Sequence, residues 1–406
     1  MKYIFLRLLI ILFVLSLSFC FATDDFSGDK SILFIGNSKT YYNNMPRMFF
    51  NLVDKGPLNI NLNYYAITWE AGSINAHHLP NIKKVLENDG NVSGTIPRFY
   101  RDNLYKDGER IHFDYIVLQV GNVIDADTLE YDEEMDMKKR NATVEAVRLL
   151  SSEDTEIIIN SIYFRWLDGS DSLSVKRNKL KEWQEYIDES SLNMKKAILL
   201  DRDSKYKCVK VSPTGWAFVN YMFDHTTSKY FLNSGKYESE IAYNDLFIGD
   251  GQVKHNHPTR VGTYLIASTL YSTIFGQSPE GIGFYGKVGE ALTTVNNAGT
   301  ELIEGYNKEN VKLHADVVSA MQELGAKTAL ENYGIPEELL DKDYLRGDVN
   351  DDKVVDVLDV RMLLQEVLNA GSDKEYTDDE KIIMDLDLSE SIDIIDVRLL
   401  LQECIN

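Results

Sequence analysis

The sequence predicts an α/β protein, in which a parallel sheet is covered by helices on both faces, followed by a small helical module. Three observations lead to this fold class. From about residue 30, short apolar runs alternate with helix-like segments, as expected where each crossover between parallel strands contains a helix. The last 63 residues carry 17 acidic against 6 basic side chains, a net charge of −11 out of −22 for the whole chain. This acidic segment also contains two copies of one motif.

Length and composition limit the possible functions. The 406 residues are 44% hydrophobic and 26% charged, which is ordinary for globular protein, and the length suggests two to three domains. The net charge of −22 disfavours nucleic acid as a partner, because binding it would bring no general electrostatic gain.

Residues 1–22 have the pattern of a secretory signal peptide. Lys2 and Arg7 precede an apolar run over 8–19, and Cys20-Phe21-Ala22 offers a small-x-small cleavage site. The run is shorter than the roughly 18–20 residues of a membrane anchor, and Phe19 disfavours the alternative of a lipoprotein acylated at Cys20. We therefore expect a secreted, extracellular protein with no membrane attachment after cleavage. Two cysteines remain in it, which are too few for a disulfide scaffold.

The elements of the expected sheet follow one another along the chain. Buried strands are predicted at 30–36, 60–67, 113–121, 155–164 and 207–213. Helices are predicted at 45–53, 132–150, 174–196 and 260–276. The stretch 287–334 is also expected to be helical, and 334–345 to connect it to the acidic tail. Ligand sites in such sheets lie at the carboxyl ends of the strands, so motifs directly after a strand carry most of the functional information.

Two segments of the tail align without gaps at a spacing of 37 residues. Each places oxygen side chains at positions 1, 3, 5, 9 and 12 of a loop, which is the EF-hand spacing, and continues into a VRxLLQE helix. Ca²⁺ requires about six to eight oxygen ligands, and position 7 supplies a backbone carbonyl. The predicted ligands of two Ca²⁺ ions are Asp348, Asn350, Asp352, Val354, Asp356 and Asp359 in the first loop, and Asp385, Asp387, Ser389, Ser391, Asp393 and Asp396 in the second.

The tail, residues 344–406, resembles a type I dockerin, the duplicated calcium module by which secreted bacterial enzymes attach to cohesin domains of a scaffolding protein. The resemblance implies a cohesin partner and a place in a cellulosome. Position 6 departs from the EF-hand pattern, because Lys353 and Glu390 stand where glycine is usual, which predicts lower calcium affinity or backbone strain. Positions 10 and 11, which carry much of cohesin recognition in that family, are Val357-Leu358 and Ile394-Ile395. We expect a partner to cover these apolar pairs.

Ser38 is the candidate nucleophile. It lies in Ile35-Gly36-Asn37-Ser38, directly after the first predicted strand. Gly36 permits a tight bend there, and backbone N–H groups at the start of the following helix could stabilise an oxyanion. A serine at a turn is more often a cap than a nucleophile, so this tripeptide alone is weak support.

His257 is the candidate general base, because it stands ahead of an apolar helix near the end of the α/β region and could reach Ser38 across the strand ends. The two residues belong to a set of blocks that occur in a recognisable order. The blocks are FIGNSKTYY (34–42), EAGS (70–73), DYIVLQVGN (114–122), SPTGWAF (212–218) and HPTRVGTYL (257–265). Their order resembles the SGNH, or GDSL-like, hydrolases over about residues 30–277.

This resemblance implies a flavodoxin-like parallel sheet, an SGNH-type domain over 30–285, and a helical extension and linker over 286–343. It also implies roles for individual residues, without a cofactor for catalysis. Ser38 would attack an ester, with His257 as general base and then acid. The oxyanion hole would use the N–H groups of Ser38 and Gly72 and a side-chain amide. That amide is assigned to Asn122, although the family places one residue between the glycine and the asparagine, and Gln119 is the fallback.

The acid that orients the histidine is the main departure from the family. The family has an aspartate three residues before the histidine, where this chain has Lys254. Asp250, seven residues before His257, would serve if the intervening stretch is a small insertion. If His255 were the base, Asp250 would be five residues before it. A Ser-His pair without an acid would also work, at some loss of rate.

The sequence as a whole favours a secreted SGNH-type esterase that deacylates plant cell-wall polysaccharide within a cellulosome. Trp69, Trp166 and Trp216 lie near predicted strand ends and are candidates for sugar stacking, although core packing is the commoner use of aromatic residues. A second hypothesis is a non-catalytic carbohydrate-binding or structural component that keeps the SGNH fold, which Lys254 favours. A third keeps the esterase but changes the substrate to lipid or peptidoglycan acyl groups.

Overall fold

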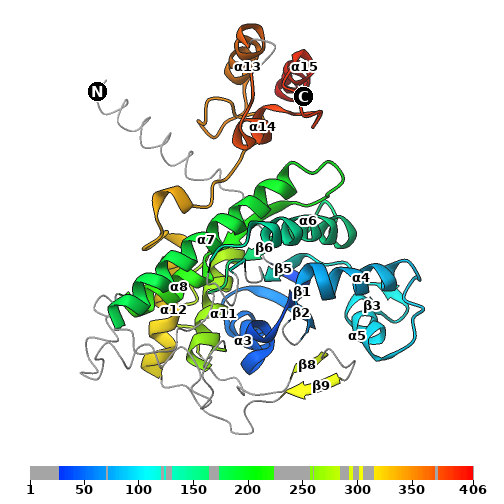
Figure 1. Cartoon of the computed structure of the whole chain (residues 1–406), viewed down its shortest axis with the longest axis vertical. Coiled ribbons are helices and arrows are strands. Elements are labelled where there is room, and N and C mark those ends of the chain that lie inside the picture. Colours follow the sequence, from blue (N-terminus) through cyan, green and yellow to red (C-terminus); the bar gives the residue numbers. More distant parts are fainter. Residues whose placement is uncertain are drawn as a thin grey trace, which may run out of the picture.

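Five parallel strands form the central sheet (Figure 1). The computed structural model describes residues 27–69, 72–119, 123–124, 130–163, 173–223, 257–258, 260–283, 292–295, 301–304, 315–370 and 374–405, so the signal peptide predicted at 1–22 lies outside them. The strands are β1 (Ser27–Gly36), β2 (Asn59–Thr68), β5 (Tyr115–Gln119), β6 (Glu156–Asn160) and β7 (Cys208–Ser212). Every neighbouring pair is parallel. The five strands predicted from the sequence are confirmed.

The strands lie in the order β2-β1-β5-β6-β7. Counted along the chain, these five strands have the order 2-1-3-4-5, which is that of flavodoxin-like sheets. Across the sheet, the chain moves outward from β1 to β2 on one side and from β5 through β6 to β7 on the other. The carboxyl ends of β1 and β5 therefore form the switch point, where α/β folds bind ligands.

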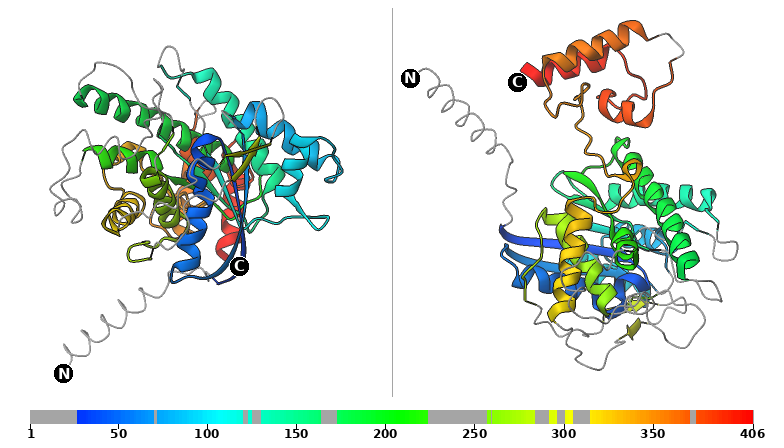
Figure 2. Two further views of the ribbon diagram at one scale, coloured as in Figure 1. Left: turned by 90° about the horizontal axis from the view of Figure 1, so that it is seen from below. Right: turned by 90° about the vertical axis from the view of Figure 1, so that its left-hand side faces the viewer.

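Helices cover both faces of the sheet, because the strands are apolar on both sides. Ile32 and Phe34 of β1 point into one core, and Leu33 and Ile35 point into the other. The first core is closed mainly by α3 (Met45–Lys55), α8 (Thr214–Phe223), α11 (Arg260–Phe275) and α12 (Ala315–Leu330), and the second by α4 (Leu79–Leu86), α5 (Thr95–Leu104), α6 (Glu133–Leu150) and α7 (Leu173–Leu199). Figure 2 shows the sheet and these helices from two further directions.

The other elements of this region are short. They are α2 (Ser38–Tyr41), η1 (Tyr42–Asn44), η2 (Ile74–His78), η3 (Glu337–Leu339), and a hairpin of β3 (Tyr105–Lys106) and β4 (Glu109–Arg110). The helix predicted over 287–334 is wrong in its first part. There β8 (Leu292–Val295) and β9 (Glu301–Glu304) form an antiparallel hairpin ahead of α12. The β-branched run Thr293-Thr294-Val295 favours a strand over a helix.

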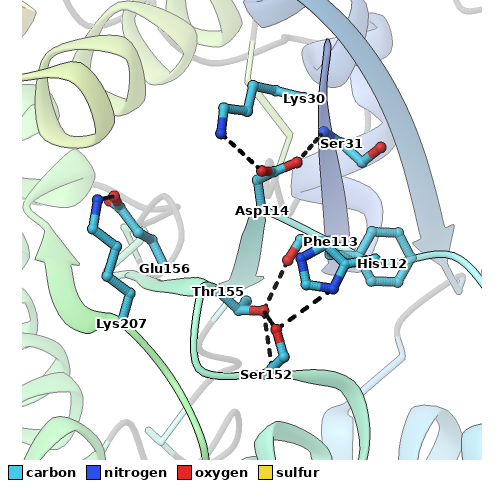
Figure 3. A network of polar contacts seen from close by, with 9 residues as sticks. All are labelled: Lys30, Ser31, His112, Phe113, Asp114, Ser152, Thr155, Glu156 and Lys207. Atoms are coloured by element: carbon cyan, nitrogen blue, oxygen red, sulfur yellow. Dashed lines mark hydrogen bonds and ion pairs between the residues drawn. The ribbon is translucent and has the colours of Figure 1, made fainter. Parts of the chain in front are cut away.

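Polar contacts hold the amino ends of the strands (Figure 3). Asp114, just before β5, accepts hydrogen bonds from Lys30 Nζ at 3.0 Å and from the Ser31 N–H at 2.8 Å. Thr155, just before β6, donates its hydroxyl to the Phe113 carbonyl at 2.8 Å. These contacts join β1, β5 and β6 at the end of the sheet opposite the switch point.

The C-terminal residues form a separate group of helices, α13 (Val357–Asn369), α14 (Asp378–Met384) and α15 (Ile394–Ile405). Figure 1 and the right-hand view of Figure 2 show this group beyond α7, away from the sheet. It touches the α/β region through polar contacts: Lys196 of α7 pairs with Asp379 at 2.7 Å, and Arg346 donates to the Leu199 carbonyl at 2.9 Å. Within the described part of the chain, no helix has both the length and the apolar character that crossing a membrane requires.

Candidate functional site

Ser38 lies at the switch point, on the turn between β1 and α2. The Thr40 N–H donates to the Asn37 carbonyl at 2.9 Å, and the Lys39 N–H donates to the Asn37 side-chain oxygen at 3.1 Å. The turn needs Gly36, because a Cβ there would lie 2.1 Å from the Thr40 hydroxyl oxygen. Ser38 itself is half-buried. The serine therefore stands at the strand-to-helix turn where the sequence places it.

Gln119, at the end of β5, ties the two strands of the switch point together. Its amide N–H donates to the Asn37 side-chain oxygen at 2.8 Å, and its carbonyl oxygen accepts the Thr40 hydroxyl at 2.5 Å. The Asn37 N–H also reaches that carbonyl oxygen, at 3.4 Å. Asn37 is thus a site residue that sequence reasoning missed, although it stands inside the GNS tripeptide. To act as the fallback oxyanion donor, Gln119 would have to release Asn37.

Gly72 reaches the same turn from the segment after β2. Its carbonyl accepts a hydrogen bond from the Asn37 side chain at 3.3 Å, so the predicted oxyanion donor lies beside the Ser38 turn. Its own N–H donates to the Trp69 carbonyl at 3.0 Å. A donor to an oxyanion must point at the substrate, so this bond would have to open for Gly72 to serve.

Asn43 joins the segment of His257 to η1, the short helix that follows α2. The Asn43 side-chain amide donates to the Pro258 carbonyl at 3.0 Å and to the Thr263 hydroxyl at 2.9 Å. Asn43 is buried and has a left-handed backbone, with φ of 53°, which asparagine adopts more readily than most residues. Segments 215 residues apart therefore meet where Asn43, five residues after Ser38, contacts Pro258, the residue after His257. The sequence carried no signal for this contact.

Other predicted site residues lie outside the described part of the chain, namely Asn122, Asp250, Lys254 and His255. Their arrangement around Ser38 and His257 stays a prediction. Trp166 lies outside it as well. Trp69 and Trp216 are buried, with 5% and 1% of their surface exposed. The prediction that these two tryptophans stack on sugars is wrong, because both side chains pack in the apolar cores.

A small pocket opens between the ends of β1 and β5. Its lining includes Gly36, Asn37, Gly72, Gln119, His78 and Lys139. Two of these, His78 and Lys139, carried no motif in the sequence, because they reach the pocket from η2 and α6 through packing alone. The pocket thus adds an imidazole and an amine to the residues that the strand ends supply.

Burial sets the charge of both groups. Burial and the neighbouring His77 lower the pKa of His78 to about 3, so its imidazole is neutral at pH 7, with Nδ1 2.9 Å from the Tyr100 hydroxyl. Burial lowers the pKa of Lys139 to about 8. Lys39, next to Ser38, is also buried and donates to the Tyr163 carbonyl at 2.5 Å. Lys39 and Lys139 thus bring two amines to this end of the sheet.

The two predicted calcium loops of the tail share one pattern of hydrogen bonds. In each loop the position 1 carboxylate accepts from the backbone N–H groups of positions 5 and 6, and the position 12 carboxylate accepts from those of positions 2 and 9. The four distances are 3.0, 2.9, 2.8 and 2.9 Å in the first loop. They are 2.8, 2.8, 2.7 and 2.8 Å in the second. The repeat in the sequence is therefore also a repeat in three dimensions.

Position 6 shows the backbone strain that the sequence predicts. Lys353 and Glu390 both have φ of 69°, and the residues at position 4, Asp351 and Leu388, have φ of 58° and 54°. Glycine adopts this left-handed region freely, whereas other residues pay roughly 1 kcal/mol or more. The matching angles show that both loops fold alike despite lacking the glycine.

The second loop brings three carboxylates together. One oxygen each of Asp385, Asp387 and Asp396 lies within 4.8 Å of the others. Burial is the main cause of a raised pKa at Asp385, and the charge of Asp396 adds to it. Carboxylates this close repel one another, and a divalent cation would relieve that repulsion. The donor set therefore fits Ca²⁺.

The remaining predicted ligands lie on the same two loops. Asp356 and Asp393, at position 9, cap α13 and α15 by accepting the N–H groups of Leu358 and Ile395 at 2.6 and 2.7 Å. The buried carboxylates at positions 1 and 12 of the first loop correspond to those of the second. The others are Asn350, Asp352, Val354, Ser389 and Ser391.

The apolar pairs at positions 10 and 11 are exposed, as the sequence predicts. Val357, Leu358, Ile394 and Ile395 have 61%, 52%, 59% and 41% of their surface accessible. They stand in the first turns of α13 and α15. Both copies thus present large apolar side chains to solvent at equivalent places.

No family model matches the chain, and no curated protein matches it. Among solved structures, a DUF4886 family protein from Bacteroides uniformis ATCC 8492 is similar, with a TM-score of 0.41 and 13% identity over 76% of this chain and 98% of that one.

Proposed function

We propose that this protein is a secreted serine esterase of the SGNH type. The observation that carries the proposal is the position of Ser38, on the turn after β1 at the switch point of the sheet. The Asn37 side chain joins that turn to Gly72. The Asn43 side chain joins η1 to Pro258, the residue after His257. The five-stranded parallel sheet is consistent with an SGNH-like fold.

In this mechanism Ser38 Oγ attacks the ester carbonyl carbon while His257 accepts the hydroxyl proton. The carbonyl π electrons move to its oxygen, and N–H groups of Ser38, Gly72 and Asn122 or Gln119 stabilise the oxyanion. Collapse of this intermediate expels the alcohol, which takes the proton from His257. Water then attacks the acyl-enzyme by the same route and releases the acid. Asp250 would orient the imidazole.

The tail supports an extracellular place of action on plant cell-wall polysaccharide. Its paired loops, with two Ca²⁺ ions bound, would present the apolar pairs at positions 10 and 11 to a cohesin domain of a cellulosomal scaffold. The exposure of those pairs supports a partner surface, because isolated apolar clusters of this kind are costly in water. Attachment would bring the Ser38 site to an insoluble substrate.

Hydrolysis of p-nitrophenyl acetate tests the catalytic proposal. We expect Ser38→Ala to lose about 10³-fold or more in kcat, because the nucleophile is removed. Ser152→Ala, a serine at the opposite end of the sheet, is the matched control and should keep wild-type activity. Equal rates for wild type and Ser38→Ala would overturn the esterase and favour the non-catalytic carbohydrate-binding or structural component. Two observations favour that alternative: Lys254 stands where the family has an aspartate, and the Gly72 N–H already donates to the Trp69 carbonyl. Acetate release from acetylated xylan, against release from peptidoglycan or lipid esters, would identify the substrate.

Binding of the full mature chain to an immobilised cohesin tests the role of the tail. We expect EDTA to abolish binding, and Val357→Asp with Leu358→Asp to weaken it at least about tenfold. Leu368→Asp is the matched control, because Leu368 is 73% exposed on the same helix but lies outside positions 10 and 11. Binding that survives both EDTA and the paired substitution would exclude a dockerin-like contact.

A further inference from the structure

The carboxylate of Asp379 joins the tail to the α/β region. Asp379 lies in the first turn of α14. One of its oxygens accepts from Lys196 Nζ of α7 at 2.7 Å and from the Tyr344 hydroxyl at 3.0 Å, and the other accepts from Lys342 Nζ at 3.3 Å. One side chain thus connects α7, α14 and the connecting segment, residues 341–347, which leads into the first predicted calcium loop.

The connecting segment is itself fixed at both ends. Asp341 accepts from the Val211 N–H of β7 at 2.9 Å and pairs with the buried Lys195 of α7 at 2.6 Å. At the other end, the Gly347 N–H donates to the Ile383 carbonyl of α14 at 2.8 Å. A flexible linker has a freely moving backbone, whereas this segment is bound to the sheet on one side and to the tail on the other. The tail therefore has a defined position on the α/β region.

The helix α14 also determines where both predicted calcium loops begin. Asp385, position 1 of the second loop, directly follows the helix, and its N–H donates to the Lys381 carbonyl at 3.0 Å. Asp348, position 1 of the first loop, follows Gly347, which α14 binds. A metal ion bound at either position 1 would therefore restrain the carboxyl end of the helix whose amino end carries Asp379.

Charge and partial burial both favour the contact between Asp379 and Lys196. The tail carries a net charge of −11, whereas Lys196 belongs to the α/β region. The two side chains are 31% and 27% exposed, so water and salt screen the pair less than they screen a fully exposed one. An isolated ion pair on a surface contributes little, but here one carboxylate binds three side chains. The contact can therefore bias the position of the tail.

We propose that docking of the tail on α7 through Asp379 and calcium binding by the tail strengthen each other. Calcium fixes the carboxyl end of α14 and the residues around Gly347, and this holds Asp379 in place for Lys196. Reciprocally, the docked helix presents both loops in the shape that binds the ion, and linkage makes the two effects equal. This inference rests on the calcium loops proposed above. A partner bound to the calcium-loaded tail would then hold the Ser38 site in one orientation.

Lys196→Gln is the sharpest test, because it changes no residue of the tail. Calorimetric titration of the full mature chain with Ca²⁺ should give a Kd at least about threefold weaker than that of wild type. Removing a positive charge near acidic loops would by itself tighten the binding of a cation, so a weaker affinity reports the lost contact. Lys181→Gln makes the same charge change at an exposed position on the same helix, and should leave the Kd unchanged.

Asp379→Asn tests the same contact from the side of the tail. It should also weaken Ca²⁺ binding at least about threefold. Asp378→Asn is the matched control, because Asp378 is an exposed carboxylate in the same turn of α14, and should weaken binding less. Lys196→Gln combined with Asp379→Asn should cost less binding free energy than the sum of the single variants, because both remove one contact.

Hydrogen exchange gives a readout that does not depend on affinity. In wild type, Ca²⁺ should slow the exchange of amides 196–200, at the end of α7, although no predicted calcium ligand lies there. In Lys196→Gln this effect should disappear, while Ca²⁺ still protects α13 and α15. Wild type that binds no Ca²⁺ would overturn the calcium loops themselves. Binding in wild type with an equal or tighter Kd in Lys196→Gln, or exchange at 196–200 that ignores Ca²⁺, would overturn the coupling and leave the loops standing.

Discussion

The Ser38 site and the two loops of the tail are built in opposite ways. Each loop closes within twelve residues, through carboxylates that accept backbone N–H groups of the same loop. The Ser38 site is closed by side-chain amides that join distant segments, Asn37 to Gly72 and Asn43 to Pro258. All of the contacts that close a loop therefore come from its own twelve residues, and the loop can form once its ligand is bound. The site exists only once the whole sheet has folded.

The two regions also differ in what stabilises them. The α/β region has a large apolar core on each face of its sheet. The buried apolar residues that pack together in the tail are Leu363, Met384, Ile392, Val397 and Leu400. So small a core gives little stability, and the four buried carboxylates at loop positions 1 and 12 add a cost. The tail thus has far more to gain from a bound metal than the α/β region has.

Removing calcium should produce the largest difference in stability between the two regions. We expect EDTA, or Asp348→Ala with Asp385→Ala, to unfold the tail while the α/β region keeps its structure. In hydrogen exchange of the full chain, amides of α13 and α15 should then exchange like those of an unfolded chain, and amides of β1 and β5 should not change. Asp351→Asn, at an exposed loop position that tolerates a left-handed backbone, is the control and should have little effect. Protection of α13 and α15 that is the same with and without calcium would contradict this account.

The second prediction concerns the contact that closes the Ser38 site. A carboxylate cannot donate to the Pro258 carbonyl, so Asn43→Asp should release the segment of His257 and lower kcat by about 10–100-fold, with less effect on KM. Asn44→Asp is a close control. Asn44 also has a positive φ, of 52°, but its side chain accepts the Arg47 N–H, which a carboxylate would do equally well. Equal kcat values for the two variants would show that Asn43 does not position the base.

The tail loops close locally and the Ser38 site closes through distant segments, and this difference decides how far each can be predicted from the sequence. In the tail the predicted ligand oxygens are spaced along one short segment, so their pattern predicted the loops, and the missing glycines predicted the strain at Lys353 and Glu390. In the α/β region, apolar runs predicted the strands, and the end of the first strand located Ser38. His78 and Lys139 could not be found in this way, because they enter the pocket only through the packing of η2 and α6. For Trp69 and Trp216, a position shortly after a predicted strand could not tell a buried side chain from an exposed one.

The smallest effect we predict lies at position 6 of the loops. Lys353→Gly and Glu390→Gly should each stabilise the calcium-loaded tail by about 0.5–1 kcal/mol, because glycine adopts φ near 69° without steric strain. Part of that gain is offset, since glycine also makes the unfolded chain more flexible. The midpoint of the tail's denaturant transition measures it.

Val354→Gly, one position further along, is the control for flexibility alone. Val354 is exposed and is not among the residues with positive φ, so glycine there should lower the midpoint. Because each loop is closed by its own backbone, the two stabilising substitutions should add, and neither should alter ester hydrolysis at Ser38. A midpoint that falls in Lys353→Gly and Glu390→Gly as it does in Val354→Gly would show that the left-handed backbone carries no strain. Gains that fail to add would show that the loops, though locally closed, fold as one unit through their shared core.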